Sequence, residues 1–541
     1  MDYFGVPEDH TPPATPPPTS GFNKIRPSQR LRSTYIGLSI TDPNLSYDDV
    51  ERVATCFEHL PSHQKRLLLN ELIDRCDNDI LAFVYNLAGS RLKIDFLKEL
   101  PIELSLHVIS YIDDPRDMAN ASRVSKFWNA LLKDEATWKS LCMKHRYRRL
   151  SSILNCPSSP TWQHYVQQRI QRESYRDYFW RKYNTDVAWR QGTGRIIQCP
   201  NSIGQAIVTS LQIDEQYIVV GCDNSVVDVF SSVTGEHLRS LRGHDGGVWA
   251  LQFAIRKIDG ARILVSGGCD RAVLVWNLDS GQLLHTLHGH TSTVRCLKVS
   301  TDAKLAVTGS RDTTIRIWDI EHGISKHLCI GHQASVRCLD VHDNQVATGS
   351  YDATARLWDM QTGRCLHVFT GHHCQVYSIA YDGTHVATGS LDWTVRVWSP
   401  ITGQCLALLQ GHTSLVGHVQ LLSPIDSPPL LVSAGADGCL RVWDLQRYAC
   451  RHRISAHDNS ISCFQVDCKR ILSGGNDGVV KLWDLETGSL IRTFSDLTST
   501  VIWKLQFTDT KAAIVYQLPS QSNHASPDTV IELHHFDLLS A

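Results

Sequence analysis

The sequence lacks several features that mark common functional classes. It has 17 cysteines, yet no two of them stand in a C-x-x-C pair, so neither RING-type zinc spacing nor a redox pair is indicated. No apolar run is long enough to span a membrane, and the N-terminus has no signal-peptide pattern. We therefore expect a soluble intracellular protein with reduced thiols and no membrane partner.

An excess of charge of one sign is also missing. The formal net charge is -2 and the isoelectric point is near 6.9, which argues against a general nucleic-acid binder. No Cys-His nucleophile pair and no convergent carboxylate set is visible, so an enzyme is the weakest reading, and we expect no catalytic residue, metal or cofactor. With 541 residues the chain is too long for one core, and two or more domains are expected.

What the sequence does contain is a skeleton that recurs through its second half. Residues 289–319 read GHTSTVRCLKVSTDAKLAVTGSRDTTIRIWD, and similar units follow at intervals of about 40 residues. Each opens near a Gly-His or Ala-His pair and closes on a tryptophan; these are Trp276, Trp318, Trp358, Trp398, Trp443 and Trp483. This is the WD40 signature. Apolar and polar residues alternate in short runs, which predicts four strands per unit.

A single four-stranded sheet cannot bury both of its faces, so the units must stack into a closed ring. Two weaker units, residues 206–230 and 501–539, end on Phe230 and Phe536 instead of tryptophan and bring the count to eight. The last unit lacks an outer strand, and we expect residues 195–198 to supply it. The predicted fold is an all-β eight-bladed WD40 propeller over residues 194–541, preceded by all-α modules.

The first part of the chain is predicted to contain a tail and a helical segment. Residues 1–45 are rich in proline and poor in apolar residues, and we expect a disordered tail with Thr-Pro steps at Thr11 and Thr15. Residues 46–93 show apolar residues at helical spacing, with Ser62 as an expected N-cap. Two readings stay open for this segment: a helical lead-in packed on the next module, or a homodimerisation element.

Residues 94–145 form a second helical module. Pro101 suits a first helical turn, and Leu104, Val108, Ile109 and Ile112 follow as one apolar stripe. The LPIEL run, the Asp-Asp-Pro break and the VSKFW run resemble an F-box. The resemblance implies binding of the S-phase-kinase-associated adaptor, and through it a cullin. The residues expected to bind the adaptor are Leu100, Pro101, Leu104, Val108 and Ile112.

Residues 146–193 are predicted to be a helical linker with an aromatic and basic bias. Aromatic rings beside arginines suit a nucleic-acid patch, but a stalk that packs its aromatics on the propeller and exposes its charges is the favoured reading. The run KHRYRRL at residues 144–150 suits a nuclear signal, although the end of a helix explains it better. Nucleus and cytoplasm are the expected locations.

Functional residues should appear where the repeats disagree. The repeated His and Asp recur too regularly to be catalytic and are expected to be structural. Five residues after each repeated His, the units hold Trp249, Arg295, Arg337, Tyr377, Gly417 and Ser462, and just before each turn Asp they hold Cys269, Arg311, Tyr351, Leu391, Ala436 and Asn476. Both positions should lie at one mouth of the ring. Basic and aromatic residues gather in adjacent units.

Arg295, Arg311 and Arg337 have no acids in the matching positions, so an anion is expected to join them. A guanidinium pairs two oxygens at once, and a phosphate offers three acceptors. Tyr351 adds a hydroxyl. Flat walls for a proline or leucine are supplied by Trp249 and Tyr377, and hydroxyls for a second phosphate by Ser292 and Thr293.

The runs HTSTVRC, TGSRD, SVRCLD and GSYD resemble the propellers of cell-division-control type F-box/WD-repeat receptors. That family reads phosphothreonine-proline degrons for a cullin-based ubiquitin ligase and carries a dimerisation segment. By the resemblance, Arg295, Arg311, Arg337 and Tyr351 bind the phosphate, while Trp249 and Thr293 line a proline pocket. Cys269 and Lys504 depart from the residues that the family commonly has there. The alternative function is a WD40 scaffold outside the ubiquitin system.

Overall fold

The computed structural model describes residues 47–92, 95–147, 174–200, 203–257, 259–423, 428–494, 501–518 and 528–537. Its internal contacts divide the chain between Glu99 and Leu100, and each part is treated by itself. The predicted tail at 1–45 lies outside the described residues, as does the larger part of the predicted linker.

The first part contains four helices: α1 Tyr47–His59, α2 Ser62–Ile73, α3 Asn78–Leu92 and α4 Phe96–Glu99. The helical prediction for this segment agrees with them. The predicted cap was wrong: Pro61 is the N-cap of α2, and Ser62 is already helical and caps nothing. None of the described side chains of α1, α2 and α3 is buried, so their apolar residues remain in contact with solvent.

The helical module of the second part contains α5 Ile102–Ile109, α6 Pro115–Ala121, α7 Lys126–Leu131 and α8 Glu135–Lys144. The side chains of Asp114, Ser125 and Asp134 accept hydrogen bonds from backbone N–H groups at the starts of α6, α7 and α8, which satisfies donors that a helix leaves unpaired. Pro101 is the N-cap of α5 instead of a residue of its first turn.

The predicted apolar stripe of this module divides over two faces of α5. Ile109 is 1% exposed, whereas Leu104 is 50% and Val108 41% exposed. One residue advances the helix by about 100°, so Ile109 turns inward while its neighbour Val108 turns outward. Only part of the expected stripe therefore faces solvent.

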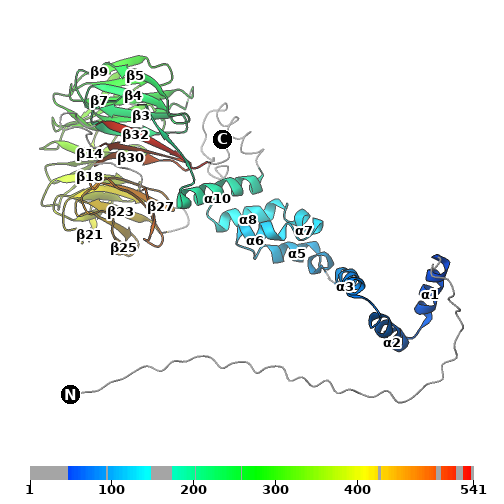
Figure 1. Cartoon of the computed structure of the whole chain (residues 1–541). Coiled ribbons are helices and arrows are strands. Elements are labelled where there is room, and N and C mark those ends of the chain that lie inside the picture. Colours follow the sequence, from blue (N-terminus) through cyan, green and yellow to red (C-terminus); the bar gives the residue numbers. More distant parts are fainter. Residues whose placement is uncertain are drawn as a thin grey trace, which may run out of the picture. The chain divides into compact units, whose positions relative to one another are not determined.

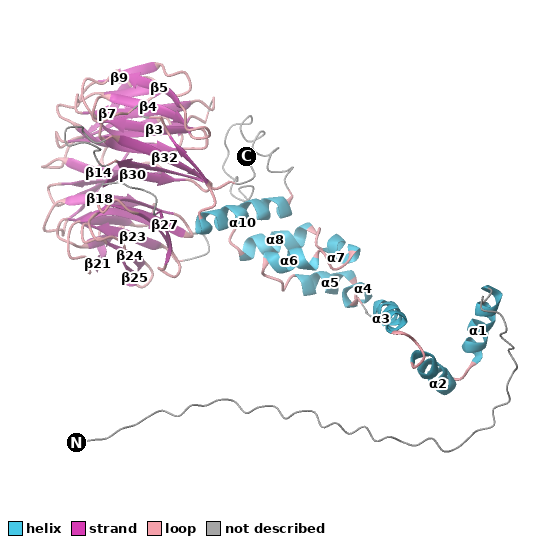
Figure 2. Ribbon diagram, in the orientation of Figure 1, coloured by secondary structure: helices cyan, strands magenta, loops and turns pink. Residues whose placement is uncertain are grey.

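Eight four-stranded antiparallel sheets, numbered here as blades 1–8 in chain order, form the propeller (Figures 1 and 2). Blade 1 holds β2 Val208–Ile213, β3 Tyr217–Cys222, β4 Val226–Ser231 and β5 His237–Arg242; blade 2 holds β6 Val248–Ile255, β7 Arg262–Gly268, β8 Val273–Asn277 and β9 Leu283–Leu287. Blade 3 holds β10 Val294–Val299, β11 Leu305–Ser310, β12 Ile315–Asp319 and β13 Ile324–Cys329; blade 4 holds β14 Val336–His342, β15 Gln345–Ser350, β16 Ala355–Asp359 and β17 Cys365–Phe369. Blade 5 holds β18 Val376–Tyr381, β19 Val386–Ser390, β20 Val395–Trp398 and β21 Cys405–Leu409; blade 6 holds β22 Val416–Leu422, β23 Leu430–Gly435, β24 Cys439–Asp444 and β25 Ala449–Ser455. Blade 7 holds β26 Ile461–Val466, β27 Arg470–Gly475, β28 Val480–Asp484 and β29 Leu490–Phe494; blade 8 holds β30 Val501–Phe507, β31 Lys511–Gln517, β32 Thr529–His535 and β1 Arg195–Gln198.

This architecture confirms the predicted eight-bladed propeller, including its closure. β1 pairs antiparallel with β32, with Ile197 opposite Leu533, so a strand from before blade 1 completes blade 8. The seam between blades 8 and 1 is also crossed by the buried Lys511, whose Nζ donates to the Glu215 carbonyl at 2.7 Å. Closing the ring in this way removes two open sheet edges.

A polar network fixes the inside of six blades. In each, the repeated His lies 2.7–3.0 Å from an Asp through Nδ1 and 2.8–3.0 Å from a Ser or Thr hydroxyl through Nε2. The closing tryptophan donates to the same hydroxyl. Since indole N–H can only donate, the hydroxyl proton goes to Nε2, and the ring donates from Nδ1 to the carboxylate. These His and Asp residues are therefore structural, as expected.

Neighbouring blades are joined near the axis by side chains that cap backbone groups of the next inner strand. Five glutamines accept from such an N–H at 2.6–2.9 Å: Gln212, Gln252, Gln420, Gln465 and Gln506. Asp340 does the same for blade 5. The Ile213 N–H donates to the Gln506 side chain at 2.8 Å across the seam between blades 8 and 1. The ring is therefore closed by the same kind of glutamine bond that joins other neighbouring blades.

Histidines on the outer strands provide a second set of links at the rim. Nε2 of His285, His327 and His452 lies 2.7–3.2 Å from a backbone carbonyl in the third turn of the following blade. Beneath the His285 ring, Gly323 has a φ of 69°, and a Cβ there would lie 2.5 Å from Nδ1. Position 323 therefore requires glycine, both for its left-handed backbone conformation and because the His285 ring leaves no room for a side chain.

The helix α10 Tyr175–Gln191 connects the helical module to the propeller. Phe179 is fully buried and packs beside Trp138 of α8 at 5.6 Å between ring centroids. At its other end, Trp189 stacks on Phe536 of blade 8 at 3.9 Å and donates to the Asp509 carbonyl. The predicted stalk thus packs aromatics on the propeller as expected, but its aromatics also cover the helical module.

The sequence predicted that the charges of α10 would be exposed, but Asp186 is paired with blade 7. Asp186 accepts from Lys469 at 2.7 Å, from Arg470 at 2.9 Å and from the Tyr147 hydroxyl at 2.8 Å. Lys469 and Arg470 in turn lower the pKa of Asp186, against the opposing effect of its burial. α10 is therefore fixed to blade 7 by ion pairs that are partly buried. Trp162, Tyr165 and Arg169, expected in the same stalk, lie outside the described residues.

No helix in the described ranges is both long and apolar enough to cross a membrane.

The buried histidines make the stability of the propeller depend on pH. Burial lowers the pKa of His372 and His457, and together with nearby positive charges it lowers that of His418 and His535 to about 4. An unfolded histidine titrates near about 6.5, so the unfolded chain binds more protons below that pH and stability falls as the pH falls.

We therefore predict a Tm that drops progressively between pH 7.5 and pH 4.5, measured by scanning calorimetry. Asp392 and Asp437, whose folded pKa is lowered to about 2 against the opposing effect of burial, extend the loss below about pH 4. A flat Tm from pH 7.5 to pH 4.5 would contradict the buried neutral histidines.

Candidate functional site

Every inner strand begins with the same irregularity, a β-bulge. The register shifts by one residue between Val294 and Cys296 in blade 3 and at the equivalent pairs of the other seven blades. The extra residues are Thr209, Trp249, Arg295, Arg337, Tyr377, Gly417, Ser462 and Trp503. A bulge re-aims the side chain that it inserts, and six of these residues are those singled out by the repeat comparison.

The two variable positions of each blade are held side by side by the backbone. The N–H of Arg311 donates to the Thr293 carbonyl, two residues before the bulged Arg295, at 2.9 Å. In blade 4, the N–H of Tyr351 donates to the Ser335 carbonyl at 3.0 Å. Residues at the start of the first strand and the end of the second therefore share one rim of the ring.

At this rim the structure brings some of the expected residues into direct contact. The Arg295 guanidinium lies over the Trp249 ring at 4.5 Å, and the Trp249 indole N–H donates to the Cys269 sulfur at 2.8 Å. Tyr351 and Tyr377 lie 5.2 Å apart between ring centroids. Trp249 and Arg295 thus form a cation–π pair between blades 2 and 3.

The charge of Arg337 acts on groups of three other blades. Its positive charge opposes the rise in the pKa of Tyr377, which burial raises first and the Tyr351 hydroxyl second. Arg337 also lowers the pKa of His418 and Lys504, after the larger effect of burial in each. Tyr377 is consequently a neutral hydroxyl beside a cation, able to donate to an anionic ligand.

The three arginines are not neutralised by the protein. In the ranges that the structure describes, no Asp or Glu forms an ion pair with Arg295, Arg311 or Arg337. Arg311 and Tyr351 are exposed, whereas Arg295 and Arg337 are partly buried. Ser292 and Thr293 lie partly exposed just before Arg295, so their hydroxyls border the same group.

The turns at this rim share one left-handed backbone position. The residue after the turn Asp has a positive φ in blades 2–5 without being glycine; these residues are Arg271, Thr313, Ala353 and Trp393. Ser225 takes the same conformation in blade 1, and blades 6 and 7 use Gly438 and Gly478 there. The conformation therefore belongs to the repeated turn and does not by itself mark the side with the large side chains.

Trp393 was missed by the sequence comparison. It is 54% exposed. It lies in the turn between β19 and β20 of blade 5, which also holds Leu391 and Tyr377. A tryptophan in a turn where the other units hold unrelated residues was the available signal. The part of the chain that the structure describes contains no group of three or more His, Cys, Asp and Glu side chains suited to a metal.

The helical module presents a second candidate surface. Leu100, Pro101, Leu104 and Val108 are exposed, and Ile112 is partly exposed. Beneath them Ser105 and Ile109 are buried. Four of the five predicted adaptor-binding residues are therefore on the outside of α5 and its approach, where a partner can reach them.

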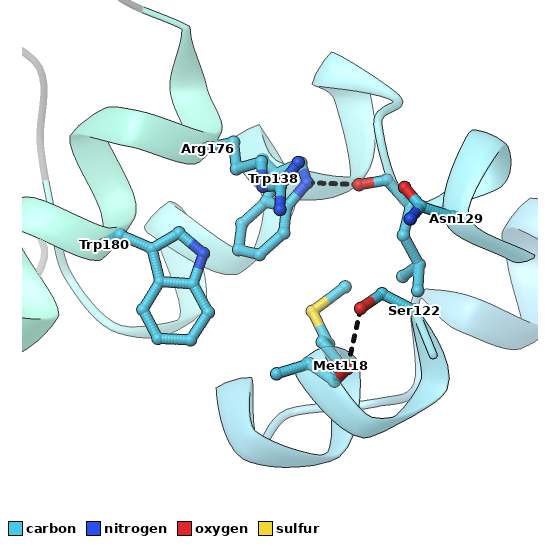
Figure 3. A pocket seen from close by; sticks show the side chains of 8 residues that line it. Met118, Ser122, Asn129, Trp138, Arg176 and Trp180 are labelled. Carbon is cyan, nitrogen blue, oxygen red and sulfur yellow. Dashed lines mark hydrogen bonds between the residues drawn. The ribbon is translucent and has the colours of Figure 1, made fainter. Parts of the chain in front are cut away.

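A small pocket of about 100 Å³ lies where this module meets α10 (Figure 3). Trp138 donates to the Leu132 carbonyl at 2.7 Å, and the Arg176 guanidinium lies 5.9 Å from the Trp138 ring. Trp180 and Met118 complete the walls. The pocket belongs to the packing that fixes α10, and its lining contains none of the predicted adaptor-binding residues.

Two family models match the chain. An F-box-like model matches residues 97–144, and a model of the WD domain, G-beta repeat, matches six segments: 235–277, 281–319, 323–359, 363–399, 403–444 and 448–484. The chain is an F-box/WD-repeat protein. The repeat model leaves most of blade 1 and all of blade 8 unmatched, and those are the blades closed by Phe230 and Phe536.

Several curated proteins are similar to part of the chain. Cell division control protein 4 of Saccharomyces cerevisiae is 31% identical over 48% of this chain and 32% of that protein. F-box/WD repeat-containing protein 7 of Drosophila melanogaster is 36% identical over 35% of this chain and 14% of its own length. The probable E3 ubiquitin ligase complex SCF subunit sconB of Aspergillus oryzae is 25% identical over 46% and 38%. The chain therefore spans well under half the length of these relatives.

Among solved structures, the computationally designed Ika8 protein matches with a TM-score of 0.54 and 30% identity, over 62% of this chain and 98% of that one.

Proposed function

We propose that this F-box/WD-repeat protein is the non-catalytic substrate-binding subunit of a cullin-based SCF ubiquitin ligase. Its helical module binds the S-phase-kinase-associated adaptor, and its propeller binds phosphorylated Thr-Pro or Ser-Pro segments of the substrate. The observation that carries the proposal is the pairing of an exposed apolar α5 with a propeller rim of unneutralised arginines. The similarity to sconB, a probable SCF subunit, supports it.

The rim has the chemistry that a phosphorylated Thr-Pro segment requires. Arg295, Arg311 and Arg337 supply guanidiniums that pair with phosphate oxygens, and Tyr351 supplies a hydroxyl. Trp249 offers an aromatic face for the proline ring. A phosphate adds about two negative charges and three acceptors, so it satisfies groups that otherwise face only water.

The helical module has the chemistry of a protein-binding surface. The exposed side chains of Leu104 and Val108 lie on one face of α5, with Leu100 and Pro101 before it. Burying such a face against a partner contributes roughly 25 cal/mol per Å² of apolar surface. The contacts of α10 with α8 and blades 7 and 8 give this surface a fixed relation to the rim, which suits the transfer of ubiquitin by a bound enzyme.

We also propose that the segment of α1–α3 joins two copies of the chain. Its apolar residues, such as Val53 and Leu72, are exposed. The first turn of α1 is acidic at Asp48 and Asp49, whereas α2 carries Lys65 and Arg66 at its fourth and fifth positions, so α1 of one copy can pair with α2 of another. Residence in both nucleus and cytoplasm is part of the same proposal, and fractionation of cells tests it.

A peptide titration tests the rim. A phosphorylated Thr-Pro peptide should bind the full chain, and its unphosphorylated form should not. The Arg311→Ala variant should lose about 2 kcal/mol of binding, a roughly 30-fold loss, because a desolvated phosphate loses a partner. Arg364→Ala, an exposed arginine at the opposite end of the blade 4 strands, is the control and should bind normally. Unchanged affinity in Arg311→Ala contradicts the site.

Co-purification tests the helical surface. The triple variant Leu104→Asp, Val108→Asp and Ile112→Asp should lose the adaptor and the cullin, since charges replace the apolar face, while peptide binding at the rim is retained. Leu328→Asp, Val368→Asp and Leu408→Asp, equally exposed residues of the propeller's outer strands, form the matched control. If the first triple variant still carries adaptor and cullin, α5 is not the adaptor-binding surface. If the wild type carries neither, a scaffold outside the ubiquitin system is the better account.

Sedimentation tests the self-association. The full chain should sediment as a dimer, and Val53→Asp with Leu72→Asp should convert it to a monomer without altering the rim. The triple α5 variant serves as the control and should remain dimeric. A wild-type monomer at micromolar concentration would rule out a stable homodimer.

A further inference from the structure

A cavity of about 500 Å³ lies where the end of α8, the second half of α10 and blade 7 meet. Small-molecule sites in proteins typically have volumes of about 300–1,000 Å³. The rim arginines Arg295, Arg311 and Arg337 do not line this cavity, and it shares no lining residue with the pocket beside Trp138. The cavity is therefore a separate feature, for which neither the rim nor the exposed face of α5 accounts.

One wall of the cavity is built by contacts among its own side chains. Asp186 of α10 holds the Lys469 ammonium at 2.7 Å and the Arg470 guanidinium at 2.9 Å. The Tyr147 hydroxyl donates to the same carboxylate at 2.8 Å, and the Lys469 ammonium lies 3.9 Å from the centroid of the Tyr147 ring. The Arg470 guanidinium lies 4.7 Å from the Trp189 ring. These side chains are already held in place, so a ligand does not have to order them.

Several cations of the lining keep N–H groups without an acceptor. Among the described residues, the exposed Arg190 forms no ion pair and no hydrogen bond. Arg146 approaches the Glu486 carboxylate only to 3.4 Å. Lys469 uses one of its three N–H groups on Asp186, and Nη1 of Arg470 has no hydrogen-bond partner. Lysine and arginine side chains can only donate, so the cavity lacks acceptor oxygens.

The acids of the lining do not supply those acceptors. Asp186 already accepts three hydrogen bonds. Asp484 accepts from two backbone N–H groups of its own turn, at 3.0 and 2.9 Å. Both carboxylates are thus occupied by the protein itself.

Acids outside the cavity neutralise only part of the positive charge. Lys144 pairs with Asp113 at 2.6 Å, and Nε of Arg470 lies 3.2 Å from Asp467. In the part of the chain that the structure describes, no such acid pairs with Arg190. A negatively charged ligand with several acceptor oxygens meets this remaining demand.

We propose that the cavity binds a small molecule with two linked phosphate groups, a diphosphate, through Arg146, Arg190 and Lys469. Guanidinium and ammonium groups form strong, charge-assisted hydrogen bonds to phosphate oxygens. The three cations stand on different elements, after α8, in α10 and in blade 7, so two phosphate groups reach more of them than one. The bound diphosphate ties the helical module to the propeller. This inference does not rest on the proposed function, because the cavity can be filled without adaptor or substrate.

Calorimetric titration of the full chain with pyrophosphate, at constant ionic strength, tests the site. We expect one saturable site per chain and a Tm that rises with pyrophosphate concentration. Arg190→Gln should weaken binding roughly tenfold, because one charge-assisted partner is lost, and Arg190→Lys should retain most of it. Arg453→Gln, which changes an exposed arginine of the outer strand β25, is the matched control and should bind normally.

Thiol labelling shows where the pyrophosphate sits. Cys468 is exposed and lines the cavity, so pyrophosphate should slow its alkylation by N-ethylmaleimide, followed by peptide mass spectrometry. Cys365, an exposed thiol of β17 outside the cavity, should react at an unchanged rate. Arg190→Gln should abolish the protection of Cys468 at the pyrophosphate concentration that protects the wild type.

Further arms separate this cavity from the rim and distinguish the sources of diphosphate. Arg311→Ala should keep pyrophosphate binding although it loses the phosphorylated Thr-Pro peptide, so failure of the rim proposal is seen independently. Tighter binding of ADP than of pyrophosphate assigns the site to a nucleoside diphosphate, and the reverse order assigns it to free pyrophosphate. Binding of neither, equal affinity for orthophosphate and pyrophosphate, or affinity unchanged in both Arg190→Gln and Arg146→Gln overturns the proposal.

Discussion

The closure of the ring is the constraint on which the rest of the structure depends. Each blade exposes apolar side chains on both faces, and only neighbours on both sides can cover them. In blade 8 this requires β1, a strand that precedes blade 1 in the sequence, to pair with β32. The inner glutamine bonds and the outer histidine bonds then fix most of the neighbouring blades relative to one another. The geometry of the rim depends on these contacts.

Much of this fold is encoded in patterns that can be read directly. The closing aromatics, including Phe230 and Phe536, identified eight blades even where the WD40 pattern fades, because a large apolar side chain is needed at that buried position. Residues 501–539 lack a fourth strand, which likewise predicted that another segment would supply the outer strand of the last blade. Here local periodicity and the requirement for closure lead to the same answer.

Other features depend on three-dimensional context that periodicity does not contain. The stripe on α5 includes Ile109 in sequence, but a rotation of one residue places it inside. Ser62 looks like a cap, yet the preceding proline already takes the extended conformation that the N-cap requires. At the rim, repeat comparison found Arg295, Arg311 and Arg337 because it detects variation at fixed positions. It missed Trp393 because that position lies in a turn.

The strand that closes the ring follows α10 after a short turn at Gly192. Trp189, near the end of α10, stacks on Phe536 at the end of blade 8, so the seam of the propeller and the anchor of the helical module share the same few residues. Separation of β1 from β32 would therefore free both at once. A partly opened molecule would lose the geometry of the rim and the anchorage of the helical module in the same event, so the integrity of each depends on the other.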